Sequence, residues 1–250
     1  MRFVLAASSQ ELPQLRLFRH TLALVAYAVS ENGDLTRSDA LRADMRGGLM
    51  GLMFHTQHFP HPDGLCRAIL QECRVRGFDG VLADFEGPRT PQSVFFFDTL
   101  GAALMREGRR LFVPLPHTVP SAQILVGTAV SGGTLEGHLG ACIARFGAKR
   151  LALDCQRLLM DFALPCRRGE GTPLTLQEIE ALRRRVGSPT FFSKELCCNY
   201  FSYCENGRAH FVAFDTADTL HKKLALAEHL GIGTAFFMLP EIRDVMQELF

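Results

Sequence analysis

Short apolar runs recur along this chain of 250 residues, and most of them are followed by a polar segment with helical periodicity. Such strand–helix alternation predicts parallel βαβ units, and eight units in about 250 residues favour a closed (β/α)8 barrel over an open sheet. No glycine-rich phosphate loop follows the first run, which argues against a dinucleotide-binding sheet. We therefore predict an α/β fold, a (β/α)8 TIM barrel that forms one domain over residues 1–250. The expected strands are Arg2–Ala7, Leu22–Val29, Gly48–His55, Phe78–Gly87, Arg110–Leu115, Arg150–Leu153, Thr190–Phe192 and Gly233–Met238.

The segments between these strands predict helices, with two exceptions. Residues 119–133 are rich in Gly, Ser and Thr, so we expect no regular structure there. Residues 203–208 are polar and contain Asn-Gly, which predicts the turn of a hairpin. The expected helices are Gln10–Arg19, Arg37–Arg46, Pro62–Arg76, Gln92–Glu107, Leu135–Phe146, Thr175–Val186, Asp218–Leu230 and Glu241–Phe250.

The fourth apolar run ends in two carboxylates, Asp84 and Glu86. Because side chains alternate along a strand, both point to the same side as Leu82. Two carboxylates at the end of a buried strand are costly unless they are paired or used. In a barrel the active site lies at the carboxyl ends of the strands. We interpret the pair as a general acid with a supporting carboxylate; the alternative is a satisfied pair that caps the next helix.

Composition excludes several classes of protein. The chain is 47% hydrophobic and 21% charged with a formal net charge of +1, which is typical of a globular domain and does not indicate binding to nucleic acid or an anionic membrane. The run Arg183–Arg185 is interpreted as a solvated helix face. Eight cysteines include no Cys-x-x-Cys pair, so we expect reduced core thiols. No apolar run has the length of a signal peptide or a transmembrane helix, which predicts a cytoplasmic protein.

The stretch Asp79-Gly80-Val81-Leu82-Ala83-Asp84-Phe85-Glu86 resembles the signature Asp-Gly-x-Asp-x-Asp-x-Glu of glycoside hydrolase family 18, the chitinase-like barrels. It differs at Leu82, where the family has an inner Asp. The pattern Phe211–Asp215, Thr219-Leu220, Lys223 and Gly231–Gly233 resembles the end of the short bacterial spore-lytic branch of that family. Residues 27–35 resemble the second strand and turn of the same branch.

The resemblance implies a substrate-assisted glycosidase that acts on N-acetylglucosamine polymers such as peptidoglycan or chitin and uses no cofactor. Glu86 would be the general acid and Asp84 would orient the acetamide of the sugar. The family's sixth strand carries Met-x-Tyr-Asp and its eighth ends in Trp, whereas this chain has Leu151–Asp154 and Phe237-Met238 and no Trp. We therefore expect hydrolysis to be weak or lost. The remaining candidate substrate-binding residues are Asp79, Asp154, Tyr27, His55, His117 and Met238.

Two other functions stay open at this point. The first is a catalytically inactive barrel that binds a glycan or a protein. The second is a metal-dependent hydrolase using His55, His58 and His117, because imidazoles at barrel strand ends suit zinc. Cys197-Cys198 as a nucleophile has no basic partner that the sequence identifies. Nothing in the sequence indicates an oligomeric state.

Overall fold

The computed structural model describes residues 1–8, 10–11, 21–38, 46–167 and 170–250, and these divide into two compact units. The first unit comprises Met1–Val126, Lys149–Leu153 and Gly233–Pro240, and the second comprises Gly127–Ala148, Asp154–Ile232 and Glu241–Phe250. Our expectation of a single domain over residues 1–250 stays a prediction, because a division into compact units does not show that either unit folds by itself. The helices expected at Gln10–Arg19 and Arg37–Arg46 lie largely outside the described residues.

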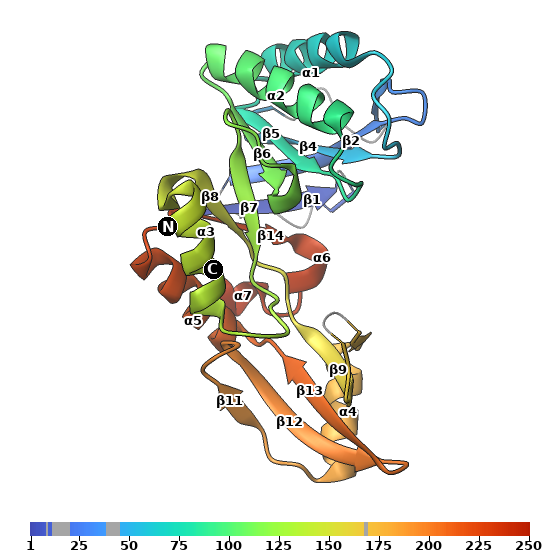
Figure 1. Ribbon diagram of the computed structural model, residues 1–250, viewed down its shortest axis with the longest axis vertical. Coiled ribbons are helices and arrows are strands. Elements are labelled where there is room, and N and C mark those ends of the chain that lie inside the picture. Colours follow the sequence, from blue (N-terminus) through green and yellow to red (C-terminus); the bar gives the residue numbers. More distant parts are fainter. Residues whose placement is uncertain (9, 12–20, 39–45, 168–169) are drawn as a thin grey trace. The chain divides into compact units, whose positions relative to one another are not determined.

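Eight parallel strands close into a barrel, as predicted (Figure 1). They are hydrogen-bonded in the order β1-β14-β8-β7-β6-β5-β4-β2, and β2 pairs again with β1. The short strand β3 (Leu35–Arg37) adds to β2 in the antiparallel sense. The barrel strands are β1 (Arg2–Ser8), β2 (Thr21–Val29), β4 (Leu49–Phe54), β5 (Gly80–Asp84), β6 (Arg110–Pro114), β7 (Gln123–Gly127), β8 (Leu151–Asp154) and β14 (Thr234–Met238).

The identity of two barrel strands differs from the prediction. The sixth strand is β7, which lies in the region where we expected no regular structure. The expected seventh strand at Thr190–Phe192 is instead β11 (Phe191–Ser193), an edge strand of the second sheet. Alternation of strands and helices is a local signal, and it does not tell which sheet a strand joins. As a result β8 is the seventh strand of the barrel and not the sixth.

Two apolar layers line the barrel wall in the first unit, one inside the barrel and one between the strands and the helices. Inside, Leu82 packs with side chains such as Ala23, Phe112 and Phe236 from other strands. Outside, α1 (Pro62–Arg76) and α2 (Pro91–Arg106) cover the neighbouring strands (Figure 1). Gly80 at the start of β5 is required by a close approach, because a Cβ there would lie 2.1 Å from the carbonyl oxygen of Arg110 on β6.

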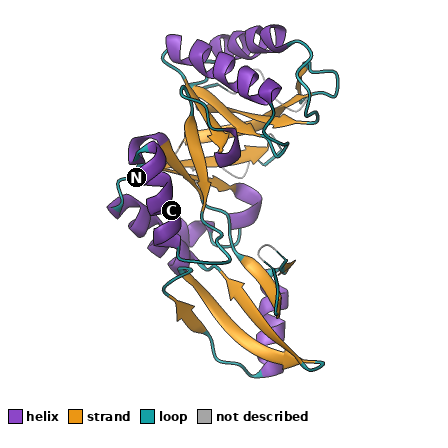
Figure 2. Ribbon diagram, in the orientation of Figure 1, coloured by secondary structure: helices purple, strands orange, loops and turns teal. Residues whose placement is uncertain are grey.

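The second unit contains a five-stranded antiparallel sheet in the order β10-β9-β13-β12-β11 (Figure 2). Asn206 and Gly207, both with positive φ, make the turn between β12 and β13, which confirms the predicted hairpin. One face of the sheet packs against α4 (Leu176–Val186), and the other buries Phe162 and Cys198. The remaining strands are β9 (Leu159–Leu164), β10 (Thr172–Pro173), β12 (Cys198–Glu205) and β13 (Arg208–Phe214).

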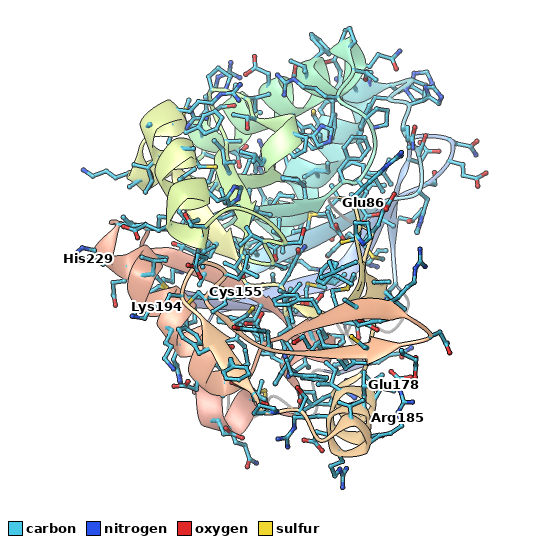
Figure 3. The ribbon with its side chains drawn as sticks, turned by 60° about the horizontal axis from the view of Figure 1, so that its bottom comes forward. Glu86, Cys155, Glu178, Arg185, Lys194 and His229 are labelled. Carbon is cyan, nitrogen blue, oxygen red and sulfur yellow. The ribbon has the colours of Figure 1, made fainter. Side chains whose placement is uncertain are left out.

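The five long helices that the structure describes begin within a residue of the predicted starts, whereas the single helix expected at Glu241–Phe250 is wrong: two short helices, Leu239–Ile242 and Met246–Leu249, form there instead. In α4 the side chains of Thr175 and Glu178 form the expected capping box, and Arg185 lies in an exposed last turn (Figure 3). No helix in the described ranges is long and apolar enough to cross a membrane. The other helices are α3 (Leu135–Phe146), α5 (Ala217–His229), α6 (Leu239–Ile242) and α7 (Met246–Leu249).

All eight cysteines are free, and six of them are buried as expected. Cys166 and Cys204 are exposed, so the expectation of core thiols is wrong for these two. Burial raises the pKa of Cys198 to about 12 and also raises the pKa of Cys197. A thiol with a raised pKa carries little thiolate at neutral pH, so this pair has no features of an activated nucleophile.

Candidate functional site

The carboxylate pair lies at the carboxyl end of β5, in the first unit. Val81 and Ala83 point outward into the layer under the helices, whereas Leu82 belongs to the cluster inside the barrel. Alternation therefore places Asp84, the last residue of β5, on the interior side. Glu86 follows two residues later and is exposed to solvent (Figure 3).

The electrostatics of Asp84 fit a carboxylate at a barrel mouth. Its side chain is open to solvent, yet the protein around it takes part of its hydration away. This partial burial, followed by the negative charge of Glu86, raises the pKa of the Asp84 carboxyl above its ordinary value. Asp84 is paired in register with Met53 of β4, which borders a cavity of about 420 Å³. Residues of β1, β2 and β3, Tyr27 among them, line most of the rest of this cavity, and Asp84 and Glu86 are not part of its lining. A cavity of this volume is within the range of small-molecule sites.

Tyr27 does not face the barrel interior. A β-bulge between Val25 and Tyr27 shifts the alternation of β2 by one residue, so Val25 packs inside and Tyr27 packs outside. The Tyr27 ring is 1% exposed, and its hydroxyl donates to Glu72 Oε2 over 3.0 Å. The Tyr27 side chain is therefore not placed beside Asp84 inside the barrel, although the residue borders the cavity next to Met53.

Asp79 lies at the opposite end of the barrel wall. It precedes the first residue of β5, so five residue-to-residue steps, or about 16 Å of strand, separate it from Asp84. Its backbone bonds to Gly48 and Arg110, and its side chain is exposed at the amino end of the strand. Asp79 is therefore removed from the candidate site, although it is part of the sequence signature.

His117 is buried and serves the protein interior. Only 2% of its surface is exposed, and its Nε2 lies 2.9 Å from the carbonyl oxygen of Gly87. Its ring meets the edge of Phe85 at a centroid distance of 4.7 Å. Burial lowers the pKa of His117, and the bond to Gly87 opposes this effect only in part. The histidine contacts the backbone next to Glu86 and is not open to a substrate.

The other candidates have different positions. Met238, the last residue of β14, packs against the interior cluster and so borders the barrel mouth. His55 directly follows β4 and is exposed. Asp154 ends β8, the seventh barrel strand, and lies in the second unit. The comparison of Leu151–Asp154 with the sixth-strand motif of family 18 is therefore wrong, because β7 (Gln123–Gly127) occupies that position.

The described residues do not support the hypothesis of a metal-dependent hydrolase. Among them, no three His, Cys, Asp or Glu side chains are grouped so that they could hold a metal ion. His55 and His58 are exposed on a loop, whereas His117 is buried against Gly87. The three histidines thus lack the shared open position that a zinc site requires.

Sequence reasoning missed the most buried polar group of the second unit. Lys223 and Asp215 are 1% and 0% exposed and form an ion pair with an Nζ–Oδ2 distance of 2.7 Å. Thr219 donates its hydroxyl to the same carboxylate over 2.8 Å. The signal was present, because these three residues belong to the C-terminal pattern that resembles the spore-lytic branch. The structure assigns them to the protein core.

No protein-family model matches the sequence, and no curated protein matches it. Solved structures do resemble it. The Bacillus cereus spore cortex-lytic enzyme SleL is 15% identical with a TM-score of 0.68, over 100% of this chain and 74% of that chain. The chitinase of Chromobacterium violaceum is 18% identical with a TM-score of 0.66, over 96% of this chain and 95% of that chain.

A third similar structure contains a sugar. It is a mutant of a plant class V chitinase from Cycas revoluta in complex with (GlcNAc)3, which is 13% identical with a TM-score of 0.65. The match covers 98% of this chain and 97% of that chain. Identities this low show the fold alone. They confirm that the chain has the barrel of the chitinases and spore cortex-lytic enzymes, as the sequence resemblance implies.

Proposed function

We propose that this chain binds a glycan containing N-acetylglucosamine at the carboxyl end of its barrel and hydrolyses it slowly. The observation that carries the proposal is the pair Asp84, which ends β5 on the interior side, and Glu86, which follows two residues later; both remain open to solvent. The related fold of a chitinase with (GlcNAc)3 bound supports the choice of sugar. Met238, at the end of the last barrel strand β14, would also contact the glycan.

The resemblance to family 18 assigns the chemistry. The N-acetyl oxygen of the substrate attacks the anomeric carbon, and Glu86, in its protonated form, donates its proton to the departing glycosidic oxygen. Asp84 accepts a hydrogen bond from the acetamide N–H and so holds the acetamide in line for the attack. Partial burial and then the negative charge of its neighbour Glu86 raise the pKa of the Asp84 carboxyl above its ordinary value.

The rate is expected to be low because two supporting contacts are absent from this chain. Leu82 replaces the inner Asp of the family, and its side chain is 8% exposed within the apolar cluster inside the barrel. The sixth barrel strand, Gln123–Gly127, contains neither Tyr nor Asp. Each lost transition-state contact costs about 2–4 kcal/mol, and two of them slow the reaction by roughly 10³- to 10⁶-fold.

The second candidate function is a barrel that binds the same glycan and does not cleave it. The observation that favours it is the apolar surrounding of Leu82, which leaves Asp84 without an acidic partner beneath it. Both functions use the same residues, and they differ only in whether Glu86 transfers a proton.

Cleavage of an N-acetylglucosamine oligomer by the purified protein separates the two functions. Slow cleavage that Glu86→Gln abolishes supports the glycosidase, with Asp79→Asn, at the far end of the same strand, as the matched control. Binding without cleavage, measured by calorimetry and lost in Asp84→Asn, supports the binding protein. Cleavage that persists in Glu86→Gln, or the absence of both cleavage and binding, would refute the proposal.

A further inference from the structure

The segments that follow β5 and β6, at the carboxyl ends of these strands, are joined by three hydrogen bonds. His117 Nε2 lies 2.9 Å from the carbonyl oxygen of Gly87 in the loop after β5. In return, Arg89 of that loop donates Nη1 to the carbonyl oxygens of Pro116 and Thr118 at 2.9 and 3.0 Å. The bonds run in both directions, so neither segment can move without breaking contacts to the other.

The protonation state of His117 follows from its partners. A carbonyl oxygen only accepts hydrogen bonds, so Nε2 carries the proton in the neutral ring. The other nitrogen, Nδ1, is buried and has no hydrogen-bond partner among the described residues. Its surroundings include the rings of Phe85 and Phe97, whose centroids lie 4.7 and 5.7 Å from that of the imidazole. Burial lowers the pKa of His117, in agreement with a neutral side chain.

A histidine at this buried position lowers the stability of the fold, and the hydrogen bond that it donates to Gly87 is what it offers in return. A buried nitrogen without a partner destabilises the fold relative to an apolar side chain of the same shape. Leu or Phe would fill the space beside Phe85 without that cost. What only the imidazole supplies here is the donor that holds the Gly87 carbonyl.

Glu86 lies between two fixed residues. On one side Phe85 is 3% exposed, and its ring centroid lies 5.1 Å from that of Phe54 and 5.6 Å from that of Phe97. On the other side Gly87 is held by His117 and has no room for a side chain, because a Cβ would lie 2.5 Å from the Phe85 ring. The backbone on both sides of Glu86 is therefore constrained.

We propose that His117 is a positioning residue for Glu86, which it keeps beside Asp84 by holding the carbonyl of Gly87. The position of Glu86 depends on the hydrogen bonds and ring contacts given above and on no assumption about catalysis. Its consequence for catalysis rests on the proposed function, in which Glu86 is the acid. His117 does not contact the substrate in this account.

The position of Glu86 can be measured without any enzymatic activity. The charge of Glu86 contributes to the raised pKa of Asp84, so the titration midpoint of Asp84 reports whether Glu86 is near. We would follow the side-chain carboxyl of Asp84 by ¹³C NMR in the native protein, His117→Leu, Glu86→Gln and the double variant. His117→Leu should lower the midpoint when Glu86 is present and leave it unchanged in the Glu86→Gln background.

Two results would overturn the proposal. One is a native midpoint in His117→Leu, which would mean that Glu86 stays in place without the bond. The other is a lowered midpoint that persists in the Glu86→Gln background, which would mean that His117 acts through general packing. His117→Gln keeps a side-chain donor and should restore the native value. His229→Leu, an exposed histidine near the end of α5, is the matched control and should change nothing.

A second variant guards against misfolding of His117→Leu. Arg89→Met removes two bonds between the same segments from an exposed side chain, and it should lower the Asp84 midpoint in the same Glu86-dependent way. An unchanged Asp84 midpoint in folded Arg89→Met would contradict the proposal that the hydrogen bonds between the two segments hold Glu86 in place. If the native protein cleaves glycan, His117→Leu should lower kcat by about two- to tenfold with KM nearly unchanged. The NMR result decides the positioning claim in either case, so its failure is distinguishable from failure of the proposed function.

Discussion

Replacement of Lys223 by Met tests the buried ion pair of the second unit. The Lys223 ammonium lies 2.7 Å from Asp215 Oδ2 and 3.2 Å from the carbonyl oxygen of Thr128, and both charged side chains are inaccessible to water. Removal of one partner from a buried pair costs about 3–5 kcal/mol, because the other charge remains without compensation. Asp215 keeps donors from the Leu158 backbone and the Thr219 hydroxyl, each at 2.8 Å, which favours the lower end of this range.

The expected loss is therefore about 3 kcal/mol in the free energy of unfolding, or roughly 6–12 °C in Tm for a chain of this length. Urea unfolding followed by circular dichroism measures it, with an unchanged m-value as the sign that only stability has changed. Lys222→Met is the matched control, because Lys222 pairs with Asp218 on the exposed side of α5 and should cost no more than about 0.5 kcal/mol.

A double variant separates the pair from its surroundings. Asp215→Asn in combination with Lys223→Met removes both charges, so it should recover about 1–2 kcal/mol relative to Lys223→Met alone. A cost below about 1 kcal/mol for Lys223→Met, or a double variant less stable than the single one, would refute the reasoning.

Three further predictions follow from contacts in the first unit. The pKa of His117 in the folded protein lies below its unfolded value of about 6.5, so the contribution of the neutral ring to stability is present above that pH and is lost as the pH falls through the folded pKa. The Tm of His117→Phe should therefore fall less steeply than that of the native protein between pH 7.5 and 5. Tyr27→Phe removes the hydrogen bond to Glu72 and should cost about 1 kcal/mol in urea unfolding while glycan binding stays unchanged; a loss of binding would contradict the outward orientation of Tyr27. Gly87→Ala forces a Cβ against the Phe85 ring and should destabilise the protein by about 1–3 kcal/mol, and a native Tm would show that the loop adapts.

The barrel could be predicted because its signal is spread over the whole chain. Apolar runs alternating with helices identify most of the strands, and one misassigned strand does not change the class of fold. One error concerns which sheet a strand joins, and another concerns a strand that was not recognised. Phe191–Ser193 has the pattern of a strand, but its partner is β12, and only the backbone hydrogen bonds show this. Gln123–Gly127 was missed because the Gly- and Thr-rich residues around it hide a short apolar core.

The candidate site could be predicted only in part. The side of β5 that carries Asp84 follows from strict alternation, and the alternation is undisturbed there. In β2 one extra residue reverses it, and no sequence pattern near Tyr27 indicates the bulge. The role of His117 depends on a contact with Gly87, 30 residues away, which residue spacing does not reveal.

The most direct test of the account is to map where an N-acetylglucosamine trimer binds. Carboxyl ¹³C signals of Asp84, Glu86 and Asp79 would be followed as the trimer is added, with Asp79 as a reporter about 16 Å away at the other end of the same strand. We expect saturable shifts at Asp84 and Glu86 and none at Asp79. Shifts at Asp79 without shifts at Asp84, or no saturable shift at either carboxylate of the pair, would contradict it.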